Sequence, residues 1–354
     1  MADSRARVLL AEDSPTVRHH LTSLINEVPG LQVVGEARDG REVVEMAETL
    51  RPDVISMDIR MPYMDGLEAT RQIMARCPTP IVVVSSLLDD DIDLSFRALQ
   101  AGALAVSPKP PSRQSPAFAD HQRRLGNMLL AMAAVRVIRR WDRVVTPEGV
   151  RDELARWPEI GRAAARLEVV VIGASAGGPS ALGTLFSHLK GALPVPVLVA
   201  QHIPEEFIPG LIRWLDKASD LTVCVAEHDR LLQPGCVYVA PGRAHLGLAR
   251  QGTQLAAQLI SEQGPHRYQP SVDVLFQSAA AVCGAGAAGV VLSGMGDDGA
   301  AGLLAIRRAG GYTFAQDQAT CIVFGMPSAA IERGAVDQTL PLDQLARALL
   351  SLVN

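Results

Sequence analysis

Residues 7–110 alternate short apolar runs with amphipathic stretches. The apolar runs are rich in β-branched residues, which is typical of buried strands. The stretches between them repeat apolar residues every three or four positions, as helices do. This alternation predicts an α/β domain whose parallel sheet is covered by helices on both faces. The predicted strands are 8–11, 32–36, 54–57, 81–85 and 104–106, and the predicted helices include 16–27, 41–50 and 67–76.

The regular pattern is interrupted and resumes near Leu167. Prolines and serines between residues 108 and 116 end the first pattern, and a basic amphipathic helix is expected from Phe118 to about Arg140. We interpret this helix as the last helix of the first domain and its basic end as a solvated surface. Residues 141–166 contain alternating charges and two prolines and predict an interdomain linker. The expected organisation is a first domain over 1–140, a linker over 141–166 and a second α/β domain over 167–354.

Composition excludes several classes of protein. The chain has 354 residues, of which 48% are hydrophobic and 20% charged, and its formal net charge of −5 argues against nucleic-acid binding. It contains no run of 18 or more apolar residues, and its start lacks the basic-then-apolar form of a signal peptide. The five cysteines are widely spaced, which predicts reduced, buried thiols. We therefore expect a cytoplasmic protein without membrane insertion, and we take it to be a monomer.

Charged residues follow the predicted strands of the first domain at their carboxyl ends, where the ligands of parallel sheets bind. Glu12 and Asp13 follow the first strand, Asp58 the third and Lys109 the fifth. Acidic residues are common in surface loops, so one of them alone would mean little. Three converging carboxylates, however, repel one another unless a hard cation such as Mg²⁺ lies between them. A carboxylate beside Mg²⁺ can attack a phosphoryl group, whose oxygens a lysine and a serine such as Ser85 would then hold.

The segment Met57-Asp-Ile-Arg-Met-Pro-Tyr-Met-Asp-Gly66, together with these residues, closely resembles a response-regulator receiver domain. The resemblance implies a flavodoxin-like (βα)5 fold with Asp58 as the phosphoacceptor. The implied Mg²⁺ ligands are Glu12, Asp13, Asp58 and the backbone carbonyl of Arg60, and the implied phosphoryl-sensing residues are Ser85 and Lys109. Receivers usually carry an aromatic residue on the fifth strand where this chain has Val106. That difference puts the usual serine–aromatic relay in question.

Residues Val169 to Gly178 read Val-Val-Val-Ile-Gly-Ala-Ser-Ala-Gly-Gly and place Ser175 on a sharp turn after a buried strand. The glycines permit the turn, and Pro179 suits the first turn of the helix expected to follow. A nucleophilic serine needs this placement, because nearby backbone N–H groups can hold an anion. The same residues also approximate a dinucleotide-binding turn, and a plain tight turn is a third interpretation.

The strands that follow discriminate between these interpretations. A dinucleotide-binding fold requires an acidic residue after its second strand, where this chain has Gln201 and His202. The turn Ser293-Gly-Met-Gly-Asp-Asp-Gly299 also follows an apolar strand. A lone histidine or Asp-Gly pair would more often be structural. A serine, a histidine and an aspartate at one sheet edge, however, supply a nucleophile, a base and an orienting carboxylate. The sequence therefore favours a serine hydrolase, in a chain order unlike that of α/β-hydrolases, chymotrypsin or subtilisin.

These motifs, with Pro270-Ser-Val-Asp-Val-Leu-Phe276 and Gly325-Met-Pro327, resemble the catalytic domain of the CheB family of chemotaxis protein-glutamate methylesterases. The similarity covers most of residues 168–345, and a receiver followed by this domain is the architecture of that family. The resemblance implies a doubly wound, mainly parallel α/β domain without a cofactor. The implied roles are Ser175 as nucleophile, His202 as general base and acid, Asp298 as orienting carboxylate, and the backbone N–H groups of Met295 and Ala176 as oxyanion donors. The family motif selects Asp298 over its neighbour Asp297.

The resemblance also implies a function and its regulation. Such an enzyme hydrolyses glutamyl methyl esters on the cytoplasmic helices of a methyl-accepting chemoreceptor, releasing methanol, and deamidates glutamines there. Its receiver covers the active site until a CheA-type histidine kinase supplies a phosphoryl group. The alternative is a two-component receiver fused to a non-catalytic module that binds receptors or nucleotides. Nucleotide binding without methanol release would favour that alternative.

Overall fold

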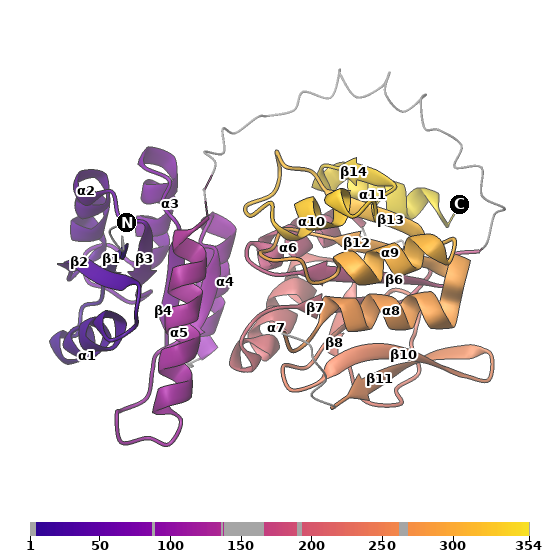
Figure 1. Ribbon diagram of the computed structural model, residues 1–354, viewed down its shortest axis with the longest axis horizontal. Coiled ribbons are helices and arrows are strands. Elements are labelled where there is room, and N and C mark those ends of the chain that lie inside the picture. Colours follow the sequence, from indigo (N-terminus) through magenta and orange to yellow (C-terminus); the bar gives the residue numbers. More distant parts are fainter. Residues whose placement is uncertain are drawn as a thin grey trace.

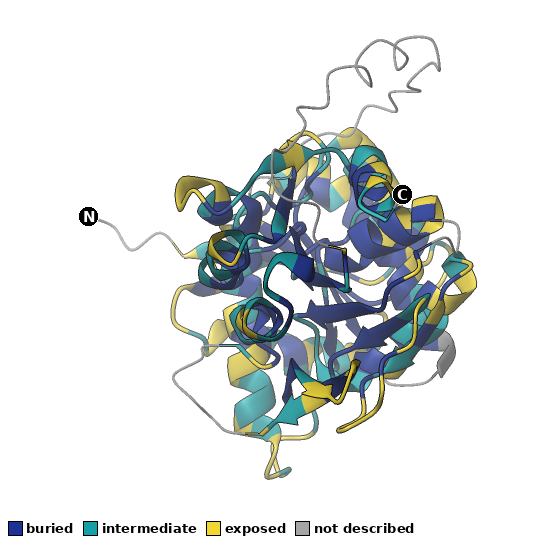
Figure 2. Cartoon of the chain, turned by 90° about the vertical axis from the view of Figure 1, so that its right-hand side faces the viewer, coloured by how far each residue is buried: buried dark blue, intermediate teal, exposed yellow. Residues whose placement is uncertain are grey.

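The chain forms two parallel β-sheets, each covered by helices. This computed structural model describes residues 5–86, 89–135, 137, 166–189, 193–261 and 268–353. Figure 1 shows the N-terminal sheet on one side of the molecule and the C-terminal sheet on the other. In Figure 2 the strands form a buried interior, and exposed residues gather on the outer helices and turns. The predicted α/β class is confirmed.

The N-terminal sheet has five parallel strands in the order β2-β1-β3-β4-β5. The strands are β1 (Ala6–Ala11), β2 (Leu31–Ala37), β3 (Val54–Met57), β4 (Ile81–Ser85) and β5 (Ala105–Pro108). The helices are α1 (Pro15–Asn26), α2 (Gly40–Leu50), α3 (Gly66–Arg76), α4 (Asp89–Ala101) and α5 (Phe118–Ala133). Every residue of β3 and β4 is buried, as expected for parallel strands between two layers of helices. The flavodoxin-like (βα)5 arrangement is thus confirmed.

Side-chain N-caps define the start of three of the helices that pack on this sheet. Ser14, Asp39 and Asp65 precede α1, α2 and α3, and each side chain accepts a hydrogen bond from a backbone N–H of the first helical turn. These N–H groups have no partner within the helix, so each cap stabilises its helix by about 1 kcal/mol. Asp65 acts as a cap only seven residues after the phosphoacceptor candidate Asp58, so α3 begins close to that site.

The helix α5 is shorter than predicted. It ends at Ala133 rather than near Arg140, and the β-branched Val135 and Val137 that follow have low helix propensity. Its buried side chains share one apolar cluster with residues of β1 and β3, so α5 packs on the N-terminal sheet. The linker predicted over 141–166 lies, apart from Arg166, outside the described residues.

The C-terminal sheet has seven parallel strands in the order β14-β13-β12-β6-β7-β9-β8. The strands are β6 (Val169–Ala174), β7 (Val197–Gln201), β8 (Thr222–Val225), β9 (Cys236–Val239), β12 (Ala287–Val291), β13 (Tyr312–Gln316) and β14 (Gln338–Leu340). The helices are α6 (Gly178–Leu189), α7 (Ile208–Ala218), α8 (Val272–Cys283), α9 (Ala300–Arg308), α10 (Met326–Glu332) and α11 (Leu342–Ser351). The apolar strands expected around the three polar motifs are β6, β7 and β12.

One antiparallel pair, β10 (His245–Gln251) and β11 (Gln254–Ile260), stands apart from this sheet. It packs against α8, where the backbone N–H of Leu248 donates a hydrogen bond of 3.1 Å to Ser278 Oγ. The expectation of a mainly parallel domain is therefore confirmed, with this hairpin as its antiparallel part.

The five cysteines are free thiols, but the expectation that all of them are buried is wrong. Cys283 and Cys321 are buried, whereas Cys77, Cys224 and Cys236 are partly exposed. Cys224 lies on β8, the edge strand of the sheet, and Cys236 is the first residue of its neighbour β9, so these two positions are less well covered.

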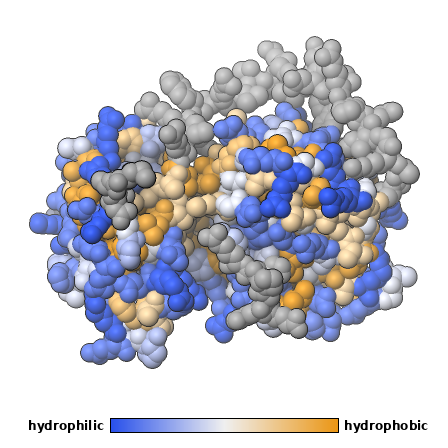
Figure 3. Space-filling model, viewed as in Figure 1, coloured by the Kyte–Doolittle hydropathy of each residue, from blue (hydrophilic) through white to orange (hydrophobic). Residues whose placement is uncertain are grey.

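Among the described helices, none has the length and apolar character needed to cross a bilayer. The face of the molecule seen in Figure 3 is mostly hydrophilic, with hydrophobic residues in small groups.

The two α/β domains touch through α4 of the first and α6 and α7 of the second (Figure 1). Phe96 on α4 stacks on Trp214 of α7 with ring centroids 5.9 Å apart and ring planes 16° apart. Ile92 of α4 lies against Gly210 of α7, where an added Cβ would come within 2.0 Å of the Ile92 side chain. Because only a glycine leaves that space, Gly210 sets how closely α4 can approach the second domain.

Candidate active site and phosphorylation site

Ser175 lies on the sharp turn that the sequence predicts, between β6 and α6. Its backbone N–H donates a hydrogen bond of 3.0 Å to the carbonyl of Ser293, and its own carbonyl accepts one of 2.8 Å from the N–H of Gly178. Gly177 has a φ of +74°, a left-handed conformation that favours glycine. The turn thus sets Ser175 at the carboxyl edge of the sheet, at the start of a helix whose buried face is apolar.

Strand register brings His202 next to Ser175. In the parallel ladder of β6 and β7, Ala174 pairs with Gln201, so the residues that follow them emerge side by side. The N–H of His202 donates a hydrogen bond of 2.9 Å to the Ala174 carbonyl. The buried Gln201 amide donates to the carbonyls of Ser175 (2.8 Å) and His202 (3.0 Å) and so ties the two turns together. Sequence reasoning assigned no such role to Gln201.

The third expected residue, Asp298, contacts the imidazole directly. Its Oδ2 lies 2.9 Å from His202 Nε2, and both side chains are nearly buried, with exposures of 7% and 11%. The neighbouring Asp297 points away: its side chain is 67% exposed and pairs with Arg333. Geometry therefore favours Asp298 over Asp297, in agreement with the motif.

The N terminus of α8 holds the Asp298 carboxylate. Asp298 Oδ1 accepts hydrogen bonds from Ser271 Oγ and the Asp273 N–H, both at 3.0 Å, and Oδ2 accepts one of 2.8 Å from the Val272 N–H. Burial by itself raises the pKa of Asp298, but the hydrogen bond from His202 and those from the helix keep this pKa below its ordinary value. Ser271 was not expected at the site, although a serine just before an apolar helical run is a recognisable N-cap signal.

The ionised Asp298 determines which ring nitrogen of His202 carries the proton. A carboxylate only accepts hydrogen bonds, so His202 Nε2 must donate and Nδ1 is left as the acceptor. Nδ1 is buried and has no hydrogen-bond partner among the described residues. Among these residues, no hydrogen bond joins the Ser175 hydroxyl to His202. Such bonds are often long in structures without substrate.

The two expected oxyanion donors border the same turn. A Cβ at Gly294 would lie only 2.8 Å from Ser175 Cβ, so the loop that carries Met295 passes directly beside the serine. Within the described part of the chain, the backbone N–H groups of Met295 and Ala176 donate no hydrogen bond. Both are thus available to an oxygen that develops negative charge next to Ser175.

The N-terminal domain covers one side of this turn. The N–H of Gly177 donates a hydrogen bond of 3.1 Å to the carbonyl of Leu104, which lies just before β5. Ala176 and Val323 are buried in one apolar cluster with Leu104. The residues flanking Ser175 therefore contact the first domain directly, in addition to the packing of α4 on α7.

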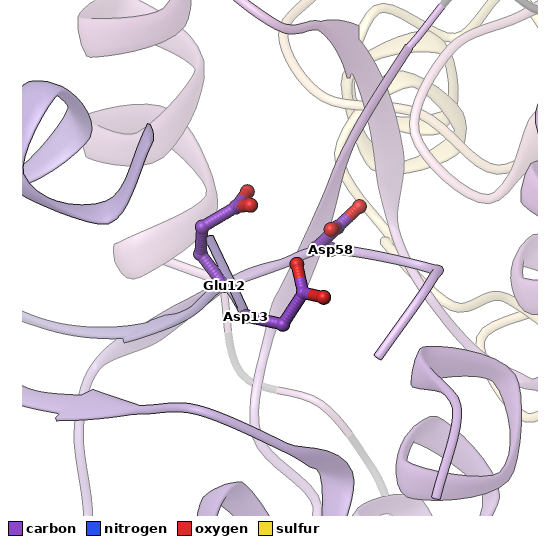
Figure 4. A group of neighbouring side chains, drawn as sticks. All are labelled: Glu12, Asp13 and Asp58. Carbon is purple, nitrogen blue, oxygen red and sulfur yellow. The ribbon is translucent and has the colours of Figure 1, made fainter. Parts of the chain in front are cut away.

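Three carboxylates gather at the carboxyl edge of the first sheet. Glu12 and Asp13 follow β1, Asp58 follows β3, and their side chains extend toward one another in Figure 4. One oxygen from each lies within 4.8 Å of the others. Lys109 Nζ lies 2.8 Å from Glu12 Oε2 and 3.0 Å from Asp58 Oδ2.

The electrostatics of this cluster fit a bound cation. Burial raises the pKa of Glu12, and the negative charge of Asp58 raises it further. Burial also raises the pKa of Asp58, although the nearby charge of Lys109 acts in the opposite direction. Burial lowers the pKa of Lys109, but its contacts with Glu12 and Asp58 hold that pKa above its usual value. One lysine thus faces three crowded carboxylates, and oxygen ligands in such a cluster suit Mg²⁺.

The remaining expected residues surround the same point. Ser85 ends β4, is buried, and its Oγ has no hydrogen-bond partner among the described residues. Arg60 follows Asp58 in the next loop, and its guanidinium contacts Asp91 of α4. A cavity of about 780 Å³, lined by Asp13, Arg60 and residues of α4, opens at this site. Val106 is buried in β5, so a small apolar residue fills the position where receivers carry an aromatic ring.

Comparison with known proteins assigns both domains. The model of the CheB methylesterase family matches residues 170–349, and that of the response regulator receiver domain matches residues 8–115. The chain belongs to the CheB methylesterase family. It is 45% identical over 352 residues to protein-glutamate methylesterase/protein-glutamine glutaminase 4 of Myxococcus xanthus, covering 99% of this chain and 98% of that protein.

Two further relatives agree with this family. Protein-glutamate methylesterase/protein-glutamine glutaminase 3 of Anaeromyxobacter dehalogenans is 46% identical over 346 residues, or 97% of this chain and 98% of that protein. The crystal structure of the CheB methylesterase catalytic domain of Thermotoga maritima is similar to 53% of this chain, over 100% of its own length. Its sequence is 38% identical to this chain over the matched residues, and the TM-score of the comparison is 0.52. The second domain therefore has the fold of CheB catalytic domains, and the first is a receiver domain.

Proposed function

We propose that this protein is a phosphorylation-regulated serine hydrolase that demethylates glutamyl methyl esters and deamidates glutamines on the cytoplasmic domains of methyl-accepting chemoreceptors. The observation that carries the proposal is the Asp298–His202 pair, held at the sheet edge where the neighbouring strands β6 and β7 lead into Ser175 and His202. The named activity of the relatives supports it. The non-catalytic alternative gives no reason for a buried carboxylate aimed at a histidine next to a strand-end serine.

Each group has a role in the proposed reaction. His202 Nδ1 removes the proton of the Ser175 hydroxyl while Oγ attacks the side-chain carbonyl carbon of the glutamyl ester. Asp298 holds the ring through Nε2 and stabilises the imidazolium that forms. The N–H groups of Met295 and Ala176 stabilise the tetrahedral oxyanion, and loss of one such donor typically costs about 100-fold or more in rate.

Collapse of this intermediate breaks the ester C–O bond. The proton on His202 passes to the leaving oxygen, methanol departs, and Ser175 retains the glutamyl group as an acyl-enzyme. Water, deprotonated by His202, then attacks the acyl carbon. The bond to Ser175 Oγ breaks, the proton on His202 returns to Oγ, and the receptor leaves with a glutamate side chain. A glutamine side chain presents the same carbonyl, and ammonia leaves in place of methanol, so one site performs both reactions.

The receiver supplies the control. Glu12, Asp13, Asp58 and the carbonyl of Arg60 would hold Mg²⁺, which neutralises charge around the incoming phosphoryl group. Asp58 accepts that group from a CheA-type histidine kinase. Lys109 Nζ and the unpartnered Ser85 Oγ then bind the phosphoryl oxygens.

Contacts between the domains indicate how phosphorylation reaches Ser175. The carbonyl of Leu104 accepts a hydrogen bond from the Gly177 N–H, and α4 packs on α7. Leu104 directly precedes β5, which Lys109 follows, and α4 lies in the chain between β4, which ends at Ser85, and β5. A phosphoryl group adds about 1.5 to 2 negative charges at neutral pH and draws new hydrogen bonds there. Movement of these two elements would uncover the turn at Ser175 and give a receptor helix access.

The proposal is tested by methanol release from a methylated chemoreceptor. The full chain, given Mg²⁺ and a small phosphodonor, should release methanol, and Ser175→Ala should abolish the release. Ser187→Ala is the matched control, because Ser187 is an exposed serine on the adjacent helix α6 and should leave the rate unchanged. Methanol release that persists in Ser175→Ala would remove the hydrolase assignment. Nucleotide binding without any release by the unmodified chain would favour the non-catalytic alternative.

A further inference from the structure

The aromatic ring of Tyr268 lies flat on the imidazole of His202. The ring centroids are 4.6 Å apart and the planes differ by 14°. Tyr268 comes only three residues before Ser271, which donates to Asp298. One short segment therefore makes both contacts. The ring of Tyr268 lies on the imidazole of His202, and the Ser271 hydroxyl that follows it donates a hydrogen bond to Asp298.

Tyr268 also reaches the loop beside Ser175. A Cβ at Gly296 would lie 3.1 Å from Tyr268 Oη, so the loop passes close to the phenol at a residue without a side chain. Gly296 directly follows Met295, whose N–H borders Ser175. The ring of Tyr268 thus extends from the imidazole face toward the loop that carries an oxyanion donor.

From this geometry we propose that Tyr268 is a positioning residue for His202. The proposal rests on the hydrolase function proposed above. The flat contact restricts rotation of the imidazole about its side-chain bond, because the ring would otherwise collide with the phenol. Nε2 then stays on Asp298, and Nδ1 stays directed away from Asp298.

The contact also favours the charged form of the imidazole during the reaction. When His202 takes the proton of Ser175, the ring becomes a cation lying against the negative face of an aromatic π system. Such cation–π contacts are stabilising, most strongly where water is excluded. The side chain of His202 is only 11% exposed, so water solvates the imidazolium poorly. The aromatic face of Tyr268 stabilises the positive charge on the side of the ring that it covers.

The matched variants separate the aromatic ring from its hydroxyl and from its bulk. Tyr268→Phe keeps the stacked ring, whereas Tyr268→Leu and Tyr268→Met fill the space without a π face. With full-length protein, Mg²⁺ and a phosphodonor, we expect Tyr268→Phe to keep kcat for methanol release within about twofold of the unmodified chain. We expect both aliphatic variants to lose about tenfold in kcat with KM nearly unchanged. Thermal unfolding of each variant establishes that the loss is not a loss of folded protein.

Three results would overturn the role of Tyr268. The first is an unchanged kcat in the aliphatic variants. The second is an equal loss in Tyr268→Phe, which would place the effect in the hydroxyl. The third is a rise in KM at constant kcat, which would mean that Tyr268 contacts the receptor. In each case the unmodified chain still releases methanol, whereas failure of the proposed function would appear as no release by the unmodified chain.

Discussion

Asp298 accepts hydrogen bonds from the start of α8, and Asp273 accepts hydrogen bonds from the start of α9. Asp298 lies just before α9 and accepts hydrogen bonds from the first N–H groups of α8, one of them the Asp273 N–H at 3.0 Å. The Asp273 side chain, in the first turn of α8, accepts from the N–H groups of Gly299 (3.0 Å) and Gly302 (2.6 Å) at the start of α9. The carboxylate that orients His202 is therefore fixed by two helices, which is the rigid support that a catalytic group needs.

This reciprocal capping predicts how Asp273 variants affect stability. Asp273→Ala removes the cap of α9 and should lower the free energy of unfolding by about 1 to 2 kcal/mol. Asp273→Asn keeps an oxygen acceptor and should be at least as stable as the unmodified chain at pH 8. The reason is that burial, and also the charge of Asp298, raise the pKa of Asp273.

The pH dependence has a definite sign. A carboxyl group whose pKa is raised in the fold opposes folding once it ionises, so this cost grows above its ordinary value of 3.8 and is complete above the raised value. Urea unfolding at pH 4 and pH 8 measures it. Equal destabilisation by Asp273→Ala and Asp273→Asn would show that the capping hydrogen bonds are not what stabilises this junction.

Substitution of Asp298 should damage the reaction more than the fold. Asp298→Asn offers an amide of the same shape but lets His202 adopt the wrong tautomer, so kcat should fall by about 10³- to 10⁴-fold. KM should change little, because Asp298 touches His202 rather than substrate. Methanol-release kinetics on folded protein check this, and a variant within tenfold of normal kcat would contradict the assigned role.

Asp298 also makes a prediction for acid conditions. Its pKa is held below the ordinary value of 3.8, so its contribution to stability is present above pH 3.8 and is lost as pH falls through the lower folded value. Asp298→Asn should lack this part of the acid destabilisation. Unfolding free energies measured from pH 5 downward would show a flatter curve for the variant, and parallel curves would oppose this interpretation.

Gly210→Ala should raise activity in the absence of phosphorylation. The added methyl group meets Ile92 at 2.0 Å, so α4 must move away from α7. The same change favours the helix α7 itself by about 1 kcal/mol, so damage to that helix does not explain an effect. Basal methanol release should rise several-fold, and the rate with phosphodonor should stay the same. An unchanged basal rate would mean that the packing of α4 on α7 does not restrain the enzyme.

Cys283 should react more slowly with alkylating reagents than the partly exposed Cys224 and Cys236. Burial raises the pKa of Cys283 to about 11, so almost no thiolate is present at pH 8. Iodoacetamide labelling of the folded chain, located by mass spectrometry, should modify the partly exposed Cys224 and Cys236 before Cys283. Early labelling of Cys283 would show that its end of α8 opens readily.

The polar strand ends were predictable because parallel sheets place them at one edge. Asp58, Ser175 and His202 each follow an apolar run that is visible in the sequence, and the register of β6 and β7 brings the last two together. Motif resemblance selected Asp298, and its buried contact with His202 agrees with that choice.

Other parts depend on tertiary contacts that local patterns do not encode. Ser271 and Tyr268 reach His202 and Asp298 only after α8 folds against β10 and α9, about 70 residues beyond His202 in the chain. The role of Gln201 was not predictable from its place next to His202, because its amide donates to the carbonyls of Ser175 and His202 only in the folded structure. The end of α5 at Ala133 likewise did not follow from the amphipathic pattern, which continues to about Arg140.

The central claim is that phosphorylation of Asp58 controls hydrolysis at Ser175, and one measurement tests it most directly. Methanol release from methylated receptor is followed with the full chain and with Asp58→Asn, each with Mg²⁺ and with or without a small phosphodonor. The account predicts that the phosphodonor accelerates release by the unmodified chain, and that Asp58→Asn keeps the basal rate without acceleration. Equal acceleration of both proteins would contradict it.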